Sequence, residues 1–285
     1  MPIPARLFGV LGDPVDHSLS PAMHNAGFAA CGLPHLYLRW RVGPAELRQA
    51  LREARDLGVG GLNLTVPLKE TALPLLDGLT AEAERIAAVN TIVWRRGRLV
   101  GDNTDARGFA RALRGRVRLR GARAVVIGAG GSARAVAASL VTGGCREIVV
   151  ANRTAARAEA LAAWLRAVGA RDVHVAALET LRRGAALEGA ALVVNTTPLG
   201  LAGRSLAVRI EATPRRCHVV DLVYGPKPSP FLRAAARAGR PVLDGAPMLL
   251  HQGALAFEAW TQRRAPLAAM ALALRSVGLA LPRRL

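Results

Sequence analysis

Cysteine, aromatic residues and long apolar runs are all scarce in this chain of 285 residues. The three cysteines, Cys31, Cys145 and Cys217, lie far apart in the sequence. An odd number of distant cysteines fits neither a disulfide framework nor a zinc motif, so we expect a reduced, cytoplasmic protein. The longest apolar run, residues 265–274, is much shorter than the roughly 18 to 20 residues of a membrane span. We also expect no signal peptide, because the N-terminus contains Arg6 and prolines but no long apolar run.

Acidic residues are outnumbered by basic ones, 20 to 39, which gives a formal net charge of +19. Such a charge can indicate nucleic-acid binding. The arginines, however, are spread along the chain without a basic tail, and aromatic residues make up only 4% of it. That is too few for a row of base-stacking side chains. We therefore expect attraction for small anions, with neither a nucleic acid nor a membrane as partner.

Lysine is nearly absent, since only Lys69 and Lys227 occur among the basic residues. Lys69 closes the stretch Asn63-Leu64-Thr65-Val66-Pro67-Leu68-Lys69, whose first residues alternate between polar and apolar as in a strand. Pro67 ends that strand because it has no N–H to donate. Lysine, unlike arginine, can lose its proton at accessible pH. Lys69 is therefore a candidate acid–base group, and a surface lysine without function is the alternative.

Strand and helix patterns alternate along the chain, which predicts an α/β fold with mainly parallel sheets. In the first hundred residues we predict strands at 6–10, 35–41, 62–66 and 89–93 and helices at 20–31, 44–57 and 71–86. Ser20 is expected to cap the first of these helices. A second series has strands at 124–127, 147–150, 173–176, 192–195, 219–223 and 241–243. Its helices are predicted at 107–113, from the loop at 128–133 to about 141, at 155–168 and at 231–238. The chain is expected to end in helices at 247–264 and 266–277.

A glycine-rich loop, Gly128-Ala129-Gly130-Gly131-Ser132-Ala133, follows the strand at 124–127 and opens a helix. In a dinucleotide site such glycines let backbone N–H groups approach the pyrophosphate, and the helix N-terminus adds positive charge. An NAD site usually has an acid after the next strand, to bind the ribose 2′-hydroxyl. This chain has Asn152-Arg153-Thr154 there, with Arg157 one helical turn later. The missing acid and the two guanidiniums predict NADP, and an ordinary glycine-rich turn is the alternative.

Taken together, the motifs resemble the shikimate dehydrogenase family from one end of the chain to the other. Those of the N-terminal part are Gly12-Asp13-Pro14-Val15-x-His17-Ser18-x-Ser20-Pro21-x-x-His24-Asn25, Asn63-x-Thr65-x-Pro67-x-Lys69, Ala88-Val89-Asn90-Thr91 and Gly101-x-Asn103-Thr104-Asp105. Those of the later part are the glycine loop, Asn152-Arg153-Thr154-x-x-Arg157, Asn195-Thr196-Thr197-Pro198-x-Gly200, Asp221-x-x-Tyr224, Met248-Leu249-x-x-Gln252-Gly253 and Phe257-Glu258-x-Trp260. One mild variation is Thr196, where the family often has alanine.

The resemblance implies an N-terminal α/β substrate domain over residues 1–105, a doubly wound Rossmann-type NADP domain over 106–246, and C-terminal helices over 247–285 that return to the substrate domain. It implies reversible, NADPH-dependent reduction of 3-dehydroshikimate to shikimate in aromatic amino-acid synthesis, by a monomer or homodimer. The residues expected to bind substrate are Ser18, Ser20, Asn63, Thr65, Asn90, Asp105, Tyr224 and Gln252. The residues expected to bind the cofactor are Gly128, Ala129, Gly130, Gly131, Ser132, Asn152, Arg153, Thr154, Arg157, Leu222 and Gly245.

Lys69 and Asp105 are the expected catalytic residues, because alcohol oxidation needs a base for the hydroxyl proton and ketone reduction needs an acid. Burial lowers the pKa of a lysine and a nearby carboxylate raises it. The sequence thus leaves open whether Lys69 transfers the proton or only donates a hydrogen bond to the developing alkoxide. His17 and His24 are unaccompanied by a third metal ligand, so no metal is expected.

Alternative interpretations remain at this stage. Ser20 and Thr104 could serve only as helix caps, and Gln252 could face solvent. For the whole chain, the alternatives are a quinate/shikimate or aminoshikimate dehydrogenase, or a catalytically silent homologue that senses metabolites or binds DNA.

Overall fold

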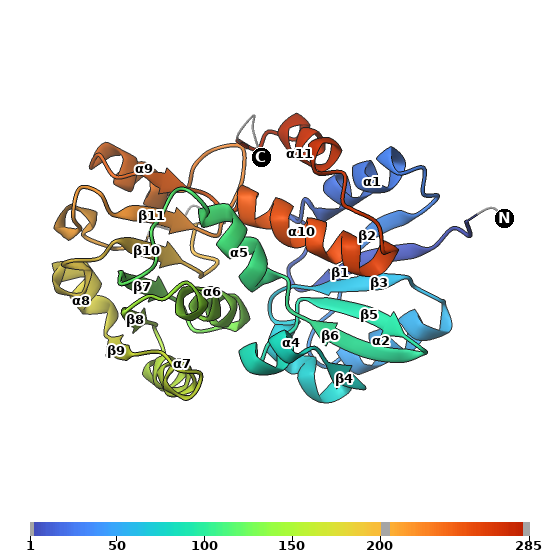
Figure 1. Cartoon of the computed structure of the whole chain (residues 1–285), viewed down its shortest axis with the longest axis horizontal. Helices are drawn as coiled ribbons and strands as arrows, with labels where there is room; N and C mark the ends of the chain where they lie inside the picture. Colours follow the sequence, from blue (N-terminus) through green and yellow to red (C-terminus); the bar gives the residue numbers. More distant parts are fainter. Residues whose placement is uncertain (1–2, 201–205, 282–285) are drawn as a thin grey trace. The chain divides into compact units, whose positions relative to one another are not determined.

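The computed structural model describes residues 3–200 and 206–281. The chain divides into two compact units (Figure 1). Unit 1 comprises Met1–Gly108 and Leu249–Leu285, and unit 2 comprises Phe109–Met248. The divisions predicted from the sequence fall after Asp105 and Ala246. Each unit contains a six-stranded sheet with helices packed on it, so the α/β class predicted from the sequence is confirmed.

The sheet of unit 1 is mixed, with strands in the order β2-β1-β3-β5-β6-β4. Its strands are β1 (Leu7–Gly12), β2 (Leu36–Arg41), β3 (Gly61–Leu64), β4 (Gly78–Leu79), β5 (Thr91–Arg95) and β6 (Arg98–Asp102). The pairings of β1 with β2, β1 with β3 and β4 with β6 are parallel. The strand β5 runs antiparallel to both β3 and β6. The carboxyl ends of β1 and β3 therefore lie at one edge, where the polar motif residues follow them.

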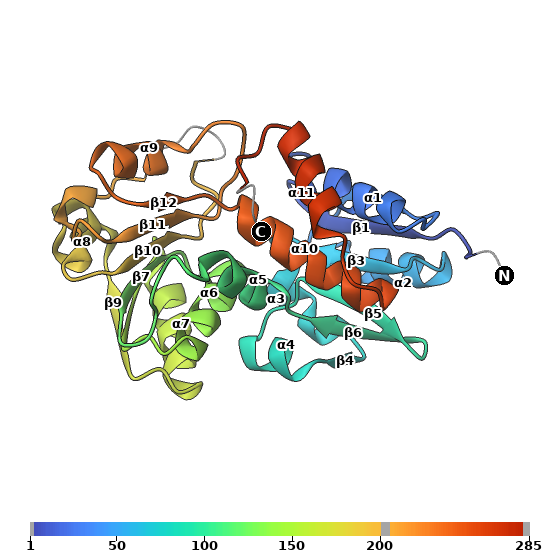
Figure 2. The ribbon, with the colours of Figure 1, turned by 45° about the horizontal axis from the view of Figure 1, so that its top comes forward.

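Helices cover both faces of this sheet. They are α1 (Ser20–Ala30), α2 (Leu47–Asp56), α3 (Leu68–Thr71), η1 (Leu73–Leu75), α4 (Ala81–Ile86), α10 (Ala246–Thr261) and α11 (Leu267–Ser276). On one face, α1 and α11 run side by side (Figures 1 and 2). Gly27 of α1 lets Met270 and Phe257 pack closely against this helix. A Cβ added at Gly27 would lie only 3.3 Å from each of these side chains. On the other face, Leu47 and Leu51 of α2 share a core with Leu62 and Leu64.

Unit 2 has an entirely parallel sheet in the order β12-β11-β10-β7-β8-β9. Its strands are β7 (Arg123–Ile127), β8 (Glu147–Ala151), β9 (Asp172–Ala176), β10 (Leu192–Asn195), β11 (His218–Asp221) and β12 (Val242–Leu243). Its helices are α5 (Asp105–Leu113), which enters from unit 1, α6 (Gly131–Thr142), α7 (Ala155–Ala167), α8 (Leu178–Arg183), η2 (Ala185–Leu187), η3 (Ile210–Ala212) and α9 (Pro230–Arg237). Counted from β7, the strand order is that of a dinucleotide-binding Rossmann sheet, as the sequence predicts.

The strands of unit 2 are apolar on both sides because both faces of the sheet are covered. Along β7, Ala124 and Val126 pack beneath α6 and α7. The alternate residues Val125 and Ile127 pack against α8, η2 and α9 on the opposite face. This arrangement leaves the loops at the carboxyl ends of β7, β8, β10 and β11 as the places where polar side chains gather.

The helix predicted over residues 71–86 is wrong, since the structure has α3, η1, β4 and α4 in this region. Pro74 and Gly78 interrupt the helical pattern. Thr80 then starts α4 anew, because its side-chain oxygen accepts a hydrogen bond from the N–H of Ala83. The short β4 pairs with β6 instead of extending a helix.

Three other predictions differ from the structure. The strand β6 was not predicted, although Arg96 and Gly97, both with positive φ, form the two-residue turn that joins it to β5. The short helix α8 was also not predicted. Ser20 is not the cap of α1, because the helix already includes it and the cap position is Leu19.

Candidate active site

Lys69 and Asp105 form an ion pair at the centre of the candidate active site in unit 1. Lys69 lies in α3, just after β3 ends, and Asp105 is the first residue of α5. The Nζ atom of Lys69 is 2.6 Å from Oδ2 of Asp105, and the two side chains are only 11% and 6% exposed. Desolvation of two charges costs several kcal/mol per ion, so such a pair is stable only where further hydrogen bonds surround it.

Asn90 supplies such hydrogen bonds, because its side-chain amide contacts three other residues around the ion pair. Its Nδ2 donates to Oδ1 of Asp105 at 2.9 Å and to Oε1 of Gln252 at 3.2 Å. Its Oδ1 accepts the backbone N–H of Thr104 at 2.7 Å. Gln252 in α10 is buried, so it does not face solvent. Thr104 directs its hydroxyl to Asn90, whereas the side chain of Asn103 accepts the N–H of Ala106 at the start of α5.

Asn63 of β3 joins the same group of buried polar side chains. Its Nδ2 donates to the backbone oxygen of Asn90 at 3.0 Å and to the hydroxyl of Thr91 at 3.1 Å. Its Oδ1 accepts a hydrogen bond of 2.7 Å from the hydroxyl of Tyr37 in β2. Tyr37 is absent from the sequence-based candidates. The one signal for it is a tyrosine within an apolar strand of a chain that has only two tyrosines.

Ser18 and Ser20 form a second polar cluster in unit 1, at the N-terminus of α1. Both are buried, their hydroxyl oxygens are 3.2 Å apart, and the N–H of Ser20 donates to Oγ of Ser18 at 3.4 Å. Arg39 of β2 donates to the backbone oxygens of Asp16 and Ser18, which holds this loop against the sheet. Two hydroxyls beside a helix N-terminus suit a carboxylate. Thr65 follows β3, and its N–H donates to the oxygen of Leu11 in β1 at 2.9 Å.

His24 packs in the core through its aromatic ring and is not placed as a metal ligand. Its ring stacks on Tyr37 with centroids 4.4 Å apart and an interplanar angle of 9°. Neither ring nitrogen has a hydrogen-bond partner, and burial lowers the pKa of His24 to about 3. His17 is exposed. Residues 3–200 and 206–281 contain no cluster of three or more His, Cys, Asp or Glu that could hold a metal ion.

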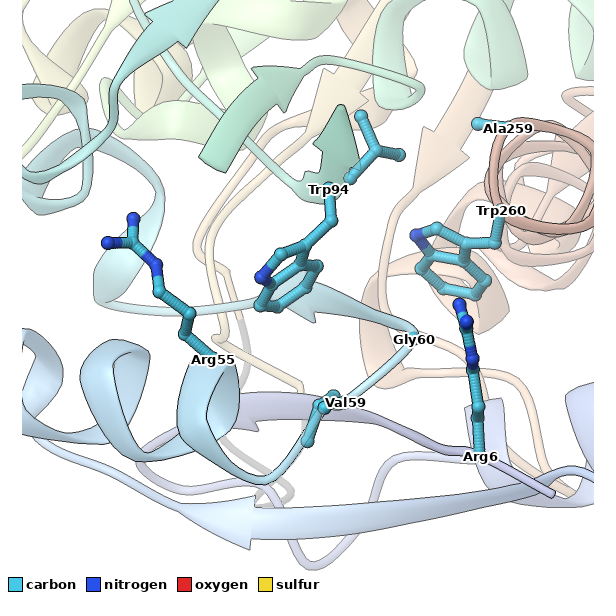
Figure 3. Close-up of a pocket in the computed structure, with 9 residues that line it drawn as sticks. Arg6, Arg55, Val59, Gly60, Trp94, Ala259 and Trp260 are labelled. Carbon is cyan, nitrogen blue, oxygen red and sulfur yellow. The ribbon is translucent and has the colours of Figure 1, made fainter. Parts of the chain in front are cut away.

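Unit 1 also contains a hollow of about 210 Å³ (Figure 3). Trp94, Trp260 and the backbone of Gly60 are among the groups that line it. Gly60 precedes β3, whereas Lys69 follows that strand, so the hollow is at the opposite end of the strand from the ion pair. Its Arg55 is already paired with Asp77 at 2.8 Å. The hollow is therefore not part of the candidate active site.

In unit 2, the loop after β7 has the backbone of a dinucleotide-binding turn. Gly128 has φ of +115°, and an added Cβ would overlap the side chain of Thr196, which follows β10. Only glycine fits there, because the left-handed conformation and the close approach both exclude a side chain. Gly130 is the N-cap of α6, which begins at Gly131. Ala129 and Ser132 complete the turn, and the N-terminus of α6 adds the partial positive charge that favours an anion.

The loop after β8 carries the predicted basic group. Asn152 donates from Nδ2 to the oxygen of Thr154 at 3.0 Å, which shapes the turn into α7. Arg153 and Arg157 are both exposed. Within the part of the chain that the structure describes, neither is paired with a carboxylate. Two free guanidiniums at one helix start can bind a phosphate.

The loops after β10 and β11 are held together by the buried carboxylate of Asp221. Its Oδ1 accepts from Nδ2 of Asn195 at 2.8 Å, and its Oδ2 accepts from the hydroxyl of Ser229 at 2.5 Å. Burial raises the pKa of Asp221, and it also raises the pKa of Asp244 in the same unit. Gly245 follows Asp244, and an added Cβ there would overlap the backbone of Leu222.

The site residues predicted from the sequence are thus distributed over both units. Unit 1 contains Ser18, Ser20, Asn63, Thr65, Lys69, Asn90, Asp105 and Gln252. Unit 2 contains Tyr224 and every predicted cofactor residue. Of the unit 1 residues, hydrogen bonds join Lys69, Asp105, Asn90, Gln252 and Asn63 into one network, and Ser18 with Ser20 form a separate pair.

Comparison with known proteins identifies what this combination resembles. Residues 10–92 match the family model "Shikimate dehydrogenase substrate binding domain", residues 110–197 match "Shikimate / quinate 5-dehydrogenase", and residues 245–275 match "Shikimate 5'-dehydrogenase C-terminal domain". The NADP(+) shikimate dehydrogenase of Methanopyrus kandleri is 45% identical over 273 residues, which cover 93% of each chain.

Solved structures agree with these matches. The shikimate 5-dehydrogenase of Thermus thermophilus, in complex with NADP(H) and shikimate, is 43% identical with a TM-score of 0.83. The match covers 95% of this chain and 99% of that one. The quinate dehydrogenase of Corynebacterium glutamicum, in complex with NAD, is 34% identical with a TM-score of 0.84, and the match covers 95% of this chain and 99% of that one.

The buried His24 makes the stability of unit 1 depend on pH. The pKa of the folded protein's imidazole is about 3, against 6.5 when unperturbed, so the unfolded chain binds the extra proton. Its contribution is fully present above about pH 6.5 and is lost as the pH falls toward 3. In urea unfolding, we expect the wild type to lose about 2 kcal/mol more than His24→Leu between about pH 7.5 and pH 5. Equal losses in the two proteins would contradict a neutral His24.

Proposed function

Because the chain belongs to the shikimate dehydrogenase family, we propose that it catalyses the reversible, NADPH-dependent reduction of 3-dehydroshikimate to shikimate, a step of aromatic amino-acid synthesis. The observation that carries this proposal is the buried pair of Lys69 and Asp105, 2.6 Å apart, beside the Asn90 amide. A proton donor and acceptor held at one point is what the interconversion of a ketone and a secondary alcohol requires.

Lys69 is proposed to exchange the proton with the substrate oxygen, and Asp105 to hold both the ammonium group and the substrate hydroxyl. Asn90, Gln252, Thr65 and Asn63 are the proposed hydrogen-bonding groups for the remaining hydroxyls. Ser18 and Ser20 are the proposed carboxylate site, which their hydroxyl pair beside the start of α1 supports. Tyr224 of unit 2 is also proposed to bind the substrate.

The residues of unit 2 fit an NADP dinucleotide. Gly128, Ala129, Gly130, Gly131 and Ser132 would face the pyrophosphate, since the three glycines have no side chain to keep an anion from the backbone N–H groups. Arg153 and Arg157 would hold the 2′-phosphate, with Asn152 and Thr154 shaping their loop. Leu222 and Gly245, whose backbones touch, would line the nicotinamide. When bound, this cofactor supplies or accepts the hydride, and the protein residues supply the proton.

These assignments divide the chain into a part that binds the substrate and a part that binds the cofactor. Residues 1–105 with 247–285 are proposed to bind shikimate, and residues 106–246 are proposed to bind the cofactor. No helix in the described part of the chain is long and apolar enough to cross a membrane. We further propose a cytoplasmic enzyme that works as a monomer or homodimer.

A quinate/shikimate or aminoshikimate dehydrogenase is the alternative within the family, and the match to the quinate dehydrogenase of Corynebacterium glutamicum is the observation that favours it. The deciding experiment follows absorbance at 340 nm with purified protein. Shikimate or quinate is offered with NADP or NAD, and kcat/KM is compared over the four combinations. We expect shikimate with NADP to be preferred. A protein that binds shikimate without turnover would instead be a silent metabolite sensor.

Replacement of Lys69 by alanine should remove the proton-transfer group without removing the substrate's other contacts. We expect kcat to fall by roughly a hundredfold or more, with KM changed by less than about threefold. The measurement is steady-state kinetics in both directions. Lys227→Ala is the matched control, because Lys227 is the other lysine and is exposed in unit 2. Near-normal turnover by Lys69→Ala would refute the assignment.

Loss of the two arginines after β8 should weaken NADP selectively. We expect Arg153→Ala and Arg157→Ala each to reduce kcat/KM for NADP roughly ten- to a hundredfold, because a hydrogen bond to a charged group contributes about 1.5–3 kcal/mol. The value for NAD should stay within about twofold, since NAD lacks the 2′-phosphate. Arg237→Ala, an exposed arginine of α9, controls for the loss of one positive charge. Equal losses for both cofactors would contradict the assignment.

A further inference from the structure

Tyr37 lies behind the candidate active site, in the edge strand β2 of unit 1, and is fully buried. Its ring is held by the stacked imidazole of His24. Its backbone is held by the side chain of Asn25, which accepts the N–H of Tyr37 at 2.7 Å and donates to its oxygen at 3.1 Å. With both ring and backbone fixed, the hydroxyl of Tyr37 has one position, 2.7 Å from Oδ1 of Asn63.

The direction of each hydrogen bond that the side chain of Asn63 makes is determined. The backbone oxygen of Asn90 can only accept, so the Nδ2 group of Asn63 must face it, at 3.0 Å. The Oδ1 atom of Asn63 therefore faces Tyr37, whose hydroxyl must donate. The second Nδ2 hydrogen of Asn63 goes to the hydroxyl of Thr91 at 3.1 Å. Both amide hydrogens of Asn63 are thus used within the protein.

The hydrogen bonds continue through Thr91 to Asp105. The hydroxyl of Thr91, whose oxygen accepts from Asn63, is 3.1 Å from Oδ1 of Asn90 and 3.1 Å from the hydroxyl of Thr104, which is itself 3.2 Å from Oδ1 of Asn90. The backbone N–H of Thr104 donates to the same atom at 2.7 Å, so the amide of Asn90 cannot be reversed. Its Nδ2 group consequently faces Oδ1 of Asp105, whose other oxygen holds Lys69.

We propose that Tyr37 is a positioning residue for the reaction, acting through Asn63 and Thr91 on the carboxylate that holds Lys69. This proposal rests on the proposed function and adds a positioning role to Asn63, whose Oδ1 atom accepts from the hydroxyl of Tyr37. Tyr37 fixes the far end of a buried network of hydrogen bonds, in which the amide of Asn63 cannot turn over without leaving a buried polar group unpaired.

The test is Tyr37→Phe, which deletes the hydroxyl and keeps the ring on His24. Without its donor, the Oδ1 atom of Asn63 is buried and unpaired, so the amide shifts and the ion pair shifts with it. We expect kcat to fall by roughly tenfold, because misplacement of catalytic groups by about an ångström costs up to a hundredfold. KM for shikimate should change by less than about twofold, since Ser18 and Ser20 are untouched. A normal kcat would overturn the proposal.

A purely structural role is separated from positioning by Phe28→Leu. Phe28 is buried in the same core, beside Phe8 and Phe257, and takes no part in the hydrogen bonds. We expect this variant to lower the Tm while leaving kcat within about twofold, because it removes packing and not polarity. An equal fall of kcat in both variants would show that Tyr37 acts only through the stability of the unit.

A double-mutant cycle tests the route through Asn63. If Tyr37 acts through that amide, Tyr37→Phe should leave kcat unchanged within about twofold in an Asn63→Ala background. Additive losses would overturn the route. If Tyr37→Phe fails to fold, Thr91→Val decides instead, because it breaks the next hydrogen bond of the chain and should lower kcat while leaving KM within about twofold.

A readout independent of turnover separates this proposal from the proposed function. In the NMR spectrum of ¹⁵N-labelled protein, Tyr37→Phe should shift the side-chain amide signals of both Asn63 and Asn90, and Phe28→Leu should leave them in place. Those shifts would support the chain of hydrogen bonds even if the wild type reduced another ketone. Unchanged Asn90 signals would overturn it even in an active enzyme.

Discussion

The structure of unit 1 depends on the burial of one ion pair. Lys69 and Asp105 are nearly sealed from water, and neither would be stable there with its remaining lone pairs and protons unsatisfied. The sheet solves this by bringing side chains from β3, from the start of β5 and from α10 to one place, although they are far apart in the sequence. Asn90 is central because an amide can donate to a carboxylate and accept from a backbone N–H at the same time.

Unit 2 meets a different physical requirement with different residues. A dinucleotide carries negative charge that backbone N–H groups and a helix N-terminus can bind, so the loop after β7 needs little side-chain chemistry and much free space. Glycine lets neighbouring loops approach closely at position 128 and, after β12, at position 245, where a Cβ would overlap Thr196 and Leu222 respectively. Asp221 then fixes two adjacent loops from beneath through Asn195 and Ser229. The side chains of Asn195, Asp221 and Ser229 in unit 2 thus support the backbone, whereas the buried polar side chains of unit 1 form the candidate site.

Sequence reasoning predicted most of the fold because the strands of both units are apolar runs with helical patterns between them. It failed over residues 71–86, where several short helices and a short strand follow one another. The sequence pattern of this region is charged and helix-like throughout, so it indicates a single helix. It missed β6 because the signal of a two-residue turn, Arg96-Gly97, is weak without an asparagine or aspartate. The site residues with reactive groups were predicted from motifs. Tyr37 was not, because its role arises only when β2 and β3 flank β1 in the sheet.

The scarcity of lysine explains why position 69 differs from the rest of this chain. Arginine suits the exposed sites, such as Arg153 and Arg157, because its planar fork binds phosphate and its charge is permanent. Neither property suits a group that is proposed to pass a proton and then take it back. The ammonium group of Lys69, in α3, lies 2.6 Å from Asp105. Unlike a guanidinium, an ammonium group can lose its proton. Lysine is therefore the residue suited to the proposed proton transfer at position 69, and arginine the one suited to the proposed phosphate site at positions 153 and 157.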